Sequence, residues 1–355
     1  MITIFTPSFA DAANTNAQNL TVKEVATRLD PEKFKIRMLY AAAPDDRLAR
    51  RPNTELIRWR RRGNSLRLLA GLGRRPPDVY FFPREGPLDA VFMRLRRYLF
   101  PKTALVTYVV STQDRAPTNP LLARAIREGE AVVGNSAYVS ETVTSRFGVP
   151  TRTIYDGIRR EDYFASPQLR ATNTTPVVIY AGSFQPLKRV RLAIEEASRW
   201  KDVRFRLAGQ GVEQESCREL AQQLGCRNVD FLGHISQSQL GEEMRRADIF
   251  FFPSESEGHP QVLGQAAACG LPCVAMNHYR PDYVVNGGTG FLAATDTELS
   301  EKLGLLLRRE DLRQSMSHAA VRHAAKFDWD RVAQEWELLF VDAVARRRAA
   351  SGSVA

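Results

Sequence analysis

The residues that could do chemistry in this 355-residue chain gather around one short helix, which the sequence predicts between two apolar runs. The runs are Ile249–Phe252 and Cys273–Met276, and each is typical of a strand buried on both faces. Pro260 suits the first turn of the helix, while Gly270 and Pro272 end it. The unpaired N–H groups of a first turn carry the positive end of the helix dipole. The stretch is therefore a candidate anion site, and phosphate is the ligand to expect.

An ordinary core helix fits the same residues equally well. Gly264 and the three alanines 266–268 leave one helix face almost without side chains, so that face can pack closely on a neighbour. Ser254 and Glu257 would then be capping residues and nothing more. The stretch alone does not decide between the two interpretations.

Three other loops favour the anion site. Each follows a predicted strand, and the strands are Val177–Tyr180, Phe205–Ala208 and Val229–Phe231. Ligands of parallel sheets bind at the carboxyl ends of the strands, which all meet at one edge. The residues that these loops bring to the edge are Gly182, Ser183, Lys188, Arg189, Gly209, Gly211, His234 and Ile235. Together with the helix N-terminus, they predict a phosphate cradle beside a flat slot.

The rest of the chain alternates strands with helices, which predicts two doubly wound parallel sheets, one in each half. The strands expected in the first half are Ile2–Thr6, Lys35–Tyr40, Asp78–Phe82, Ala104–Val110 and Ala131–Val133, with helices at Leu20–Leu29 and Thr54–Leu72. A polar stretch, "EDYFASPQLRATNTTP", is the expected connection between the halves.

The composition is that of a globular protein. Hydrophobic residues make up 44% and charged residues 25%, as in ordinary globular proteins. We find no apolar run long enough to span a bilayer and no export signal. The four cysteines, Cys217, Cys226, Cys269 and Cys273, have no metal-type spacing with histidines, and they fit a reducing cytoplasm. We therefore expect a cytoplasmic protein with no metal and no cofactor.

Positive charge is concentrated in the first half. The chain has a formal net charge of +10, and the segment from Asp45 to Lys102 holds fifteen basic and six acidic residues. Its arginines alternate with Trp59, Leu66, Leu69, Phe92, Leu95, Tyr98 and Phe100. A solvated helix face is the ordinary interpretation. A peripheral surface that rests on anionic lipid is the second, and nucleic-acid binding is the least favoured.

The second half resembles the donor-binding domain of glycosyltransferase family 4. The strings that carry the resemblance are "VVIYAGSFQPLKRV", "VRFRLAGQG", "VDFLGHIS", "LGEEMRRADIFFFPSESEGHPQVLGQAAACGLPCVA" and "VVNGGTGFLA". The family has the GT-B architecture, in which two Rossmann-like doubly wound domains face each other across a cleft. The resemblance implies an acceptor-side domain at 1–160, a donor domain at 161–325 and a helix at 326–345 that crosses back to the first domain. The tail 346–355 is expected to be disordered.

The resemblance also assigns roles to residues. Glu257 matches the glutamate that holds hydroxyls of the donor sugar, and Lys188 matches the lysine that neutralises the leaving phosphates. Backbone N–H groups at Gln261, Val262 and Leu263 would meet the diphosphate, beside Gly258, His259 and Pro260. Gln265 stands where the family has a second glutamate for the ribose, and a glutamine lacks the charge that strengthens such bonds.

Other positions depart from the family pattern. Ser183 replaces the usual arginine, and Arg189, at a position where glycine is common, is the candidate substitute. The glycine-rich loop of the first half is absent, so Asn14, Asn16 and Gln18 are the candidate amide donors there. Ser111 stands near the position of a donor-contacting histidine. His234 and His259 are interpreted as packing or backbone-positioning residues rather than general bases.

The function implied is hexosyl transfer, with retention, from a nucleotide-diphosphate sugar to a hydroxyl acceptor in surface polysaccharide or glycolipid assembly. Fixed cations and helix N–H groups would stabilise the leaving diphosphate, which would itself accept the acceptor's proton. The expected partners are the nucleotide sugar, a carbohydrate or lipid-linked acceptor and an anionic membrane surface. The alternatives are transfer to a nucleic acid or a small metabolite, and a non-catalytic relative that binds a nucleotide.

Overall fold

A computed structural model describes residues 1–12, 17–59, 64–82, 86–111, 119–164 and 173–352 of the chain. The chain divides into two compact units: unit 1 comprises Met1–Asp156 and Trp329–Ala355, and unit 2 comprises Gly157–Asp328. The sequence placed the boundary four residues later, after residue 160. The return of the chain to the first unit, which the resemblance implied, is observed.

Unit 1 is built on a parallel sheet of seven strands in the order β3-β2-β1-β4-β5-β6-β7. The strands are β1 (Ile2–Phe9), β2 (Phe34–Tyr40), β3 (Thr54–Arg58), β4 (Val79–Phe82), β5 (Ala104–Val109), β6 (Ala131–Gly134) and β7 (Arg152–Thr153). The five strands predicted for this half are all present.

The prediction of one helix from Thr54 to Leu72 is wrong. Residues Thr54–Arg58 form the edge strand β3, which pairs in register with β2, and helix α3 (Asn64–Arg74) begins only afterwards. The pairing sends Leu56 to the core on one side of the sheet and Ile57 to the core on the other. In a strand, consecutive side chains point to opposite faces, so Leu56 and Ile57 can both be buried. A search for helical periodicity does not detect this pattern.

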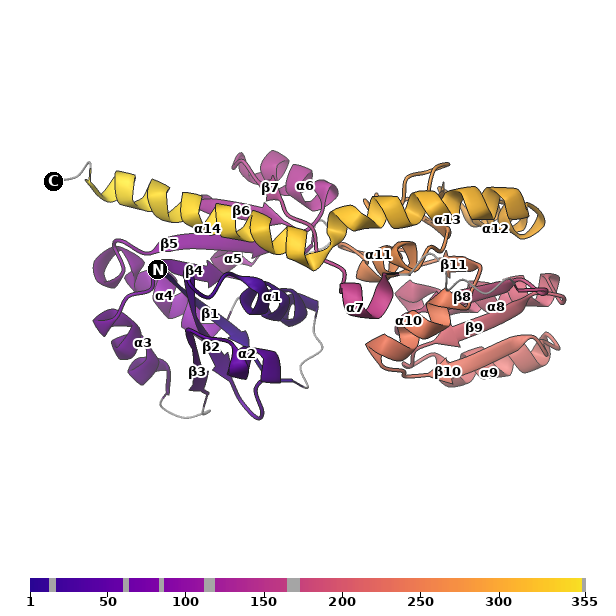
Figure 1. Ribbon diagram of the computed structural model, residues 1–355, viewed down its shortest axis with the longest axis horizontal. Coiled ribbons are helices and arrows are strands. Elements are labelled where there is room, and N and C mark those ends of the chain that lie inside the picture. Colours follow the sequence, from indigo (N-terminus) through magenta and orange to yellow (C-terminus); the bar gives the residue numbers. More distant parts are fainter. Residues whose placement is uncertain (13–16, 60–63, 83–85, 112–118, 165–172, 353–355) are drawn as a thin grey trace. The chain divides into compact units, whose positions relative to one another are not determined.

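Helices cover both faces of this sheet (Figure 1). One core holds side chains from α1 (Ala17–Arg28), α2 (Asp46–Arg50) and α14 (Trp329–Gly352). The opposite core holds side chains from α3, α4 (Pro87–Leu99), α5 (Pro120–Glu128) and α6 (Ala137–Phe147). Unit 1 is thus a doubly wound α/β sandwich, as the alternation of elements predicts.

Helix α14 belongs to unit 1 although it comes last in the chain. It packs along α1 and β5, and its residues Trp336 and Phe340 are completely buried in the core of unit 1. The prediction of a disordered tail is wrong for residues 346–352, because α14 continues to Gly352. Arg347 donates to the Pro101 carbonyl at 2.9 Å and pairs with Glu130, so the end of the helix is held to unit 1. Residues 353–355 lie outside the described part of the chain.

Unit 2 contains a parallel sheet of six strands in the order β10-β9-β8-β11-β12-β13. The strands are β8 (Val177–Ala181), β9 (Arg204–Ala208), β10 (Val229–Gly233), β11 (Ile249–Phe252), β12 (Cys273–Met276) and β13 (Gly290–Ala293). The first five were predicted, and β13 and the short β7 of unit 1 were not. The direction of winding reverses at β8, which puts a topological switch point between β8 and β11.

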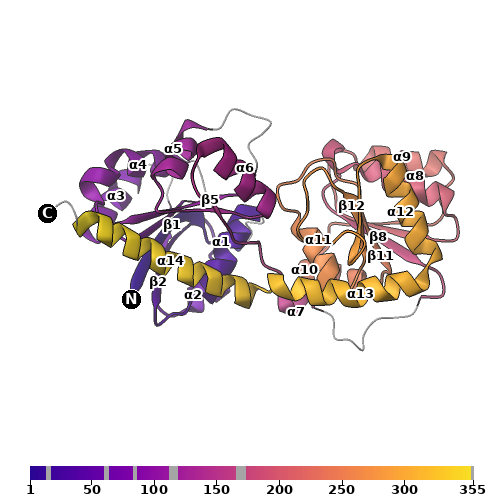
Figure 2. The ribbon, with the colours of Figure 1, turned by 90° about the horizontal axis from the view of Figure 1, so that it is seen from above.

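The helices of unit 2 precede, connect and follow these strands (Figure 2). They are α7 (Arg160–Tyr163), α8 (Val190–Arg199), α9 (Gln214–Gln223), α10 (Gln237–Arg245), α11 (Gln261–Ala268), α12 (Asp296–Arg308) and α13 (Glu310–Ala324), with 3₁₀ turns η1 (Pro186–Lys188) and η2 (Ala325–Phe327). Crossovers between parallel strands are right-handed, so the reversal at β8 places α8 and α9 on one face and α11 on the other. Helix α12 follows β13 and contacts α8, where Ser300 donates to Glu196 and accepts from Arg199.

Candidate functional site

Lys188 and Glu257, two of the charged residues that the sequence singles out, meet at the switch point of unit 2. Lys188 follows β8 and Glu257 follows β11, and these strands are neighbours in the sheet. The Lys188 ammonium donates to Oε1 of Glu257 at 2.5 Å, and the Ser254 hydroxyl donates to the same oxygen at 2.6 Å. The lysine side chain is 25% exposed and the glutamate side chain 12%. The predicted cation and the predicted sugar-binding carboxylate are therefore in one place and partly desolvated.

Backbone contacts fix the two loops to each other. The Leu187 carbonyl accepts hydrogen bonds from the Glu255 N–H at 2.9 Å and from the Ser254 hydroxyl at 3.3 Å. Lys188 is the last residue of η1, directly after this carbonyl. The position of the lysine relative to the glutamate loop therefore depends on the loop backbones and on Ser254.

Arg189 has a conformation and a partner that the sequence did not reveal. Its φ of 53° lies in the left-handed region, which explains why glycine suits this position. Its guanidinium forms an ion pair with Asp296 at the start of α12. Arg189, the candidate substitute for the arginine missing at Ser183, therefore contacts α12, while Lys188 pairs with Glu257.

The glycines of the β8 and β9 loops allow these loops to approach each other. A Cβ on Gly209 would lie 1.8 Å from the Gly182 carbonyl oxygen, and one on Gly211 would lie 2.4 Å from the Phe184 oxygen. Ser183 contributes a main-chain oxygen that accepts from the buried Tyr180 hydroxyl at 3.2 Å. The close backbone approach inferred from the sequence is real, but here it joins loop to loop.

Helix α11 fits both interpretations of its sequence, the anion site and the core helix. It begins at Gln261 after Pro260, and the Leu263 N–H already donates to the Pro260 carbonyl at 3.0 Å. The amides of Gln261 and Val262 are thus the donors that we expect to meet an anion. The small-residue face is core: a Cβ on Gly264 would lie 2.6 Å from the Tyr283 ring.

The two histidines of the site behave differently. His259 is buried and its ring stacks on Tyr283 with centroids 4.1 Å apart, as expected of a packing residue. His234 is exposed, and Ile235 is half-buried. Gly233, just before them, has a φ of 68° and accepts from the Gly209 N–H at 2.8 Å, which aligns the β10 loop with the β9 loop.

Gln265, the predicted ribose residue, has a neighbour that the sequence analysis missed. Its amide Nε2 donates to Oε1 of Gln237 at 3.3 Å, and the Tyr163 hydroxyl donates to the same oxygen. Gln237 opens α10 behind the capping box of Ser236 and Gln239. That capping pattern is readable in the sequence, and it would have placed Gln237 at the edge where Gln265 lies.

Two buried tyrosines come from the strands that flank β11: Tyr180 lies in β8, and Tyr279 comes after β12. Burial raises the pKa of Tyr180 and of Tyr279, and the negative charge of Glu257 raises both further. Tyr279 follows β12 and is 2% exposed. Among the residues that the structure describes, its hydroxyl has no hydrogen-bond partner.

The acceptor-side candidates of unit 1 are only partly described. Asn14 and Asn16 lie outside the described residues, and Gln18 is described only as backbone within α1. Ser111 lies just beyond β5 and is half-buried.

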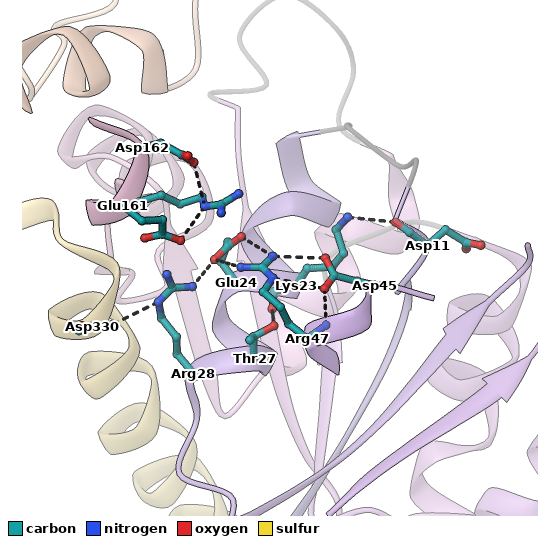
Figure 3. Close-up of polar contacts among 11 residues, drawn as sticks. Asp11, Lys23, Glu24, Thr27, Arg28, Asp45, Arg47, Glu161, Asp162 and Asp330 are labelled. Carbon is teal, nitrogen blue, oxygen red and sulfur yellow. Dashed lines mark hydrogen bonds and ion pairs between the residues drawn. The ribbon is translucent and has the colours of Figure 1, made fainter. Parts of the chain in front are cut away.

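A network of opposite charges joins α1, α2 and the end of β1 in unit 1 (Figure 3). Glu24 accepts from Arg47 at 2.8 Å and from Arg28, while the buried Lys23 donates to the Asp11 carbonyl at 3.0 Å. Burial lowers the pKa of the Lys23 ammonium. Asp45 also accepts from Arg47, at 3.2 Å. The carboxylates and cations of this network partner one another, which fits a structural role.

The described part of the chain holds neither a metal-binding cluster nor a membrane-spanning helix. Within the described ranges, no group of three or more His, Cys, Asp or Glu residues is placed to hold a metal ion. Of the helices that the structure describes, none is long and apolar enough to cross a membrane.

Solved structures share this arrangement of two doubly wound units. The structure of Anabaena Alr3699/HepE in complex with UDP matches 96% of this chain and 100% of its own, with a TM-score of 0.77 at 18% sequence identity. The fold is GT-B. The expectation from the sequence is thus confirmed for the architecture of each unit.

The family model matches the second unit of the GT-B chain. Residues 163–323 match the model of a family described as "Glycosyl transferases group 1". A D-inositol 3-phosphate glycosyltransferase of Mycobacteroides abscessus is 34% identical over 182 residues, covering 49% of this chain and 41% of the relative. The N,N'-diacetylbacillosaminyl-diphospho-undecaprenol alpha-1,3-N-acetylgalactosaminyltransferase of Campylobacter jejuni is 32% identical over 169 residues, covering 46% and 44%. The chain thus spans less than half the length of these two relatives. The family description and both names agree on glycosyl transfer.

Proposed function

We propose that the protein is a retaining glycosyltransferase of family 4 that moves a sugar from a nucleotide-diphosphate donor to a hydroxyl acceptor. The observation that carries the proposal is the meeting of Lys188 and Glu257 at the switch point of a unit that matches glycosyltransferases of group 1. The bound UDP of the Anabaena neighbour supports a uridine nucleotide as the first donor to test.

The site can stabilise a leaving diphosphate. Departure of the nucleotide develops negative charge on phosphate oxygens, and a fixed cation with helix N–H groups stabilises that charge without reorganising. Lys188 supplies the cation and the start of α11 supplies the N–H groups. Glu257, held by Ser254, would accept hydrogen bonds from sugar hydroxyls. We assign no side-chain nucleophile: the leaving phosphate takes the acceptor's proton.

A donor panel is the first test. The protein is incubated with UDP-, GDP- and ADP-sugars, and slow hydrolysis and thermal shifts are recorded. At least one nucleotide sugar should raise the melting temperature and be hydrolysed slowly. NMR of the product sugar should show the donor's anomeric configuration. Inversion would contradict the retaining mechanism, and a panel without any binding would overturn the function.

Lys188→Ala separates the phosphate contact from the sugar contact. Loss of one charge-assisted hydrogen bond is worth roughly 1.5–3 kcal/mol, so the affinity for UDP should fall about tenfold to a hundredfold. Glu257→Gln is the matched variant: it should abolish transfer while the affinity for UDP stays nearly unchanged. Calorimetry that shows full UDP affinity in Lys188→Ala, or its collapse in a folded Glu257→Gln, would contradict these roles.

We propose a lipid-linked acceptor. The residues that could form a membrane-binding surface differ from those expected from the sequence. Leu69, Phe92 and Phe100 of the predicted apolar stripe are buried in the core of unit 1, and Arg60–Arg62 lie outside the described residues. Tyr98 and Leu99, at the end of α4, are 81% and 47% exposed.

Exposed basic residues surround this apolar pair. Arg94, Arg97 and Lys102 are all exposed in the same stretch of chain, where each cation near an anionic surface is worth about 1 kcal/mol. The diphospho-undecaprenol in the name of the Campylobacter relative supports a lipid-linked acceptor of this kind.

Liposome co-sedimentation tests the surface. Binding should require anionic vesicles, weaken at high salt and fall when Arg97 and Lys102 are replaced by glutamine. Arg50→Gln is the control, because Arg50 is 84% exposed on α2, a helix of the opposite sheet face. Absence of binding at low salt would favour a soluble carbohydrate acceptor.

A further inference from the structure

Glu257 has two hydrogen-bond donors, Lys188 and Ser254, and donor binding should change the contact with Lys188. Its Oε1 accepts from the Lys188 ammonium and from the Ser254 hydroxyl. A diphosphate carries more negative charge than one carboxylate, so a bound donor competes for the lysine. If Lys188 turns to the phosphates, Glu257 loses its charged partner while it remains largely buried.

Ser254 is placed to stay with the glutamate in both states. The residue is completely buried, and its hydroxyl lies between the Leu187 carbonyl at 3.3 Å and Glu257 at 2.6 Å. Its loop is also fixed by the Glu255 N–H, which donates to the same Leu187 carbonyl. None of these contacts involves the Lys188 ammonium, so movement of that group leaves them intact.

Tyr279 supplies an unused donor at the same edge of the sheet. It lies in the loop after β12, and β12 pairs directly with β11, the strand that precedes Glu257. The tyrosine is 2% exposed, and its hydroxyl makes no hydrogen bond to any described residue. Leaving a buried polar group unpaired destabilises a protein, so native proteins seldom keep one without a reason.

We propose that Ser254 and Tyr279 are positioning residues for Glu257, and that the Tyr279 hydroxyl replaces the Lys188 ammonium as a donor to Glu257 when the diphosphate binds. The proposal rests on the function proposed above. The raised pKa of Tyr279 keeps its hydroxyl protonated at neutral pH, as a donor must be. A carboxylate that accepts from two hydroxyls is oriented by them, and it can still accept from a sugar hydroxyl.

Tyr279→Phe gives the sharper test, because it removes only the hydroxyl. Stability measured without ligand should stay the same or rise, since no hydrogen bond is lost. The affinity for UDP should fall, because its diphosphate draws Lys188 away from Glu257 and phenylalanine offers no replacement donor. The affinity for UDP-glucose, or for the sugar nucleotide that the panel selects in its place, and the transfer rate should fall about tenfold. An unchanged transfer rate, or a melting temperature lowered by several degrees without ligand, would overturn the role of Tyr279.

Ser254→Ala tests the other residue, and Glu257→Gln serves as the background that isolates its effect. In the wild-type background we expect a loss of about tenfold in transfer with UDP affinity kept. In the Glu257→Gln background, Ser254→Ala and Tyr279→Phe should have no further effect on binding of the sugar nucleotide. Equal losses in both backgrounds would show a general structural role and overturn the proposal. If the wild-type protein binds neither UDP nor any sugar nucleotide, the proposed function itself has failed.

Discussion

At the scale of single residues, Gln265 is where the chain differs most clearly from the family pattern that the rest of α11 follows. Its amide bonds to Gln237, so a pair of neutral amides stands where the resemblance implies a carboxylate on the ribose. Neutral hydrogen bonds are weaker than charge-assisted ones by about 1 kcal/mol. The nucleotide should therefore be held less tightly at the ribose than at the diphosphate.

Gln265→Glu should tighten UDP binding about fivefold, because a carboxylate accepts more strongly from the ribose hydroxyls. Calorimetry with UDP and with its 2′,3′-dideoxy analogue checks the cause. The gain should appear only with the ribose hydroxyls present, since the analogue offers no donor to the new charge. The same gain with both ligands would show that Gln265 does not face the ribose.

At the scale of elements, the small residues of α11 are required for packing. Gly264→Ala should destabilise unit 2 by roughly 1–3 kcal/mol, because the added methyl group would meet the Tyr283 ring at 2.6 Å. Gly71→Ala in α3 is the matched control: a methyl group there would have no neighbour within 4 Å, and alanine favours a helix by roughly 0.5–1 kcal/mol. Thermal unfolding should thus move in opposite directions for the two variants. A neutral Gly264→Ala would show that the helix shifts at little cost.

Helix α2 begins with a charged cap whose contribution depends on pH. Burial alone would raise the pKa of the Asp45 carboxyl, but hydrogen bonds and charge from Arg47 outweigh burial and hold that pKa below 3.8. A lowered carboxyl pKa stabilises the fold above the unfolded-state pKa and loses this effect as the pH falls through the folded-state pKa.

Asp45→Asn keeps a side chain that can cap the helix and removes the charge. The difference in unfolding free energy between wild type and variant should be largest near neutral pH and shrink below about pH 4. Denaturant unfolding from about pH 3 to pH 7 measures it. A difference that stays constant over this range would rule out the ion pair as its source.

At the scale of the whole molecule, unit 1 is made from two distant parts of the chain. Trp336 of α14 is completely buried against Phe81, with ring centroids 5.0 Å apart, although 255 positions separate them in the sequence. The last helix therefore closes the core of the first unit, and unit 2 is an insertion between the parts of unit 1.

Trp336→Ala should cost roughly 3–5 kcal/mol, the usual effect of removing a large buried aromatic side chain. Leu338→Ala, on the same helix but 65% exposed, should change stability by less than about 0.5 kcal/mol. In calorimetry, the loss in Trp336→Ala should fall on the transition of unit 1, while binding of UDP to unit 2 should still stabilise the protein. Equal effects of the two variants would contradict the packing of α14.

The sequence by itself determined the class of fold, five of the six strands of unit 2 and the edge at which Lys188 and Glu257 meet. It could do so because dense apolar runs mark buried strands, and the carboxyl ends of parallel strands share one edge. The glycines and proline around α11 marked its ends for equally local reasons.

Only the tertiary structure decided the rest. Thr54–Arg58 became a strand because β2 offered a partner, and residues 346–352 stayed helical because Glu130 and Asp78 pair with arginines of α14. Arg189 turned to Asp296, and the Tyr279 hydroxyl, in the loop after the strand next to β11, was left without a partner among the described residues. Each of these outcomes depends on groups far away in the chain, and local propensity and spacing carry no information about which distant groups become neighbours.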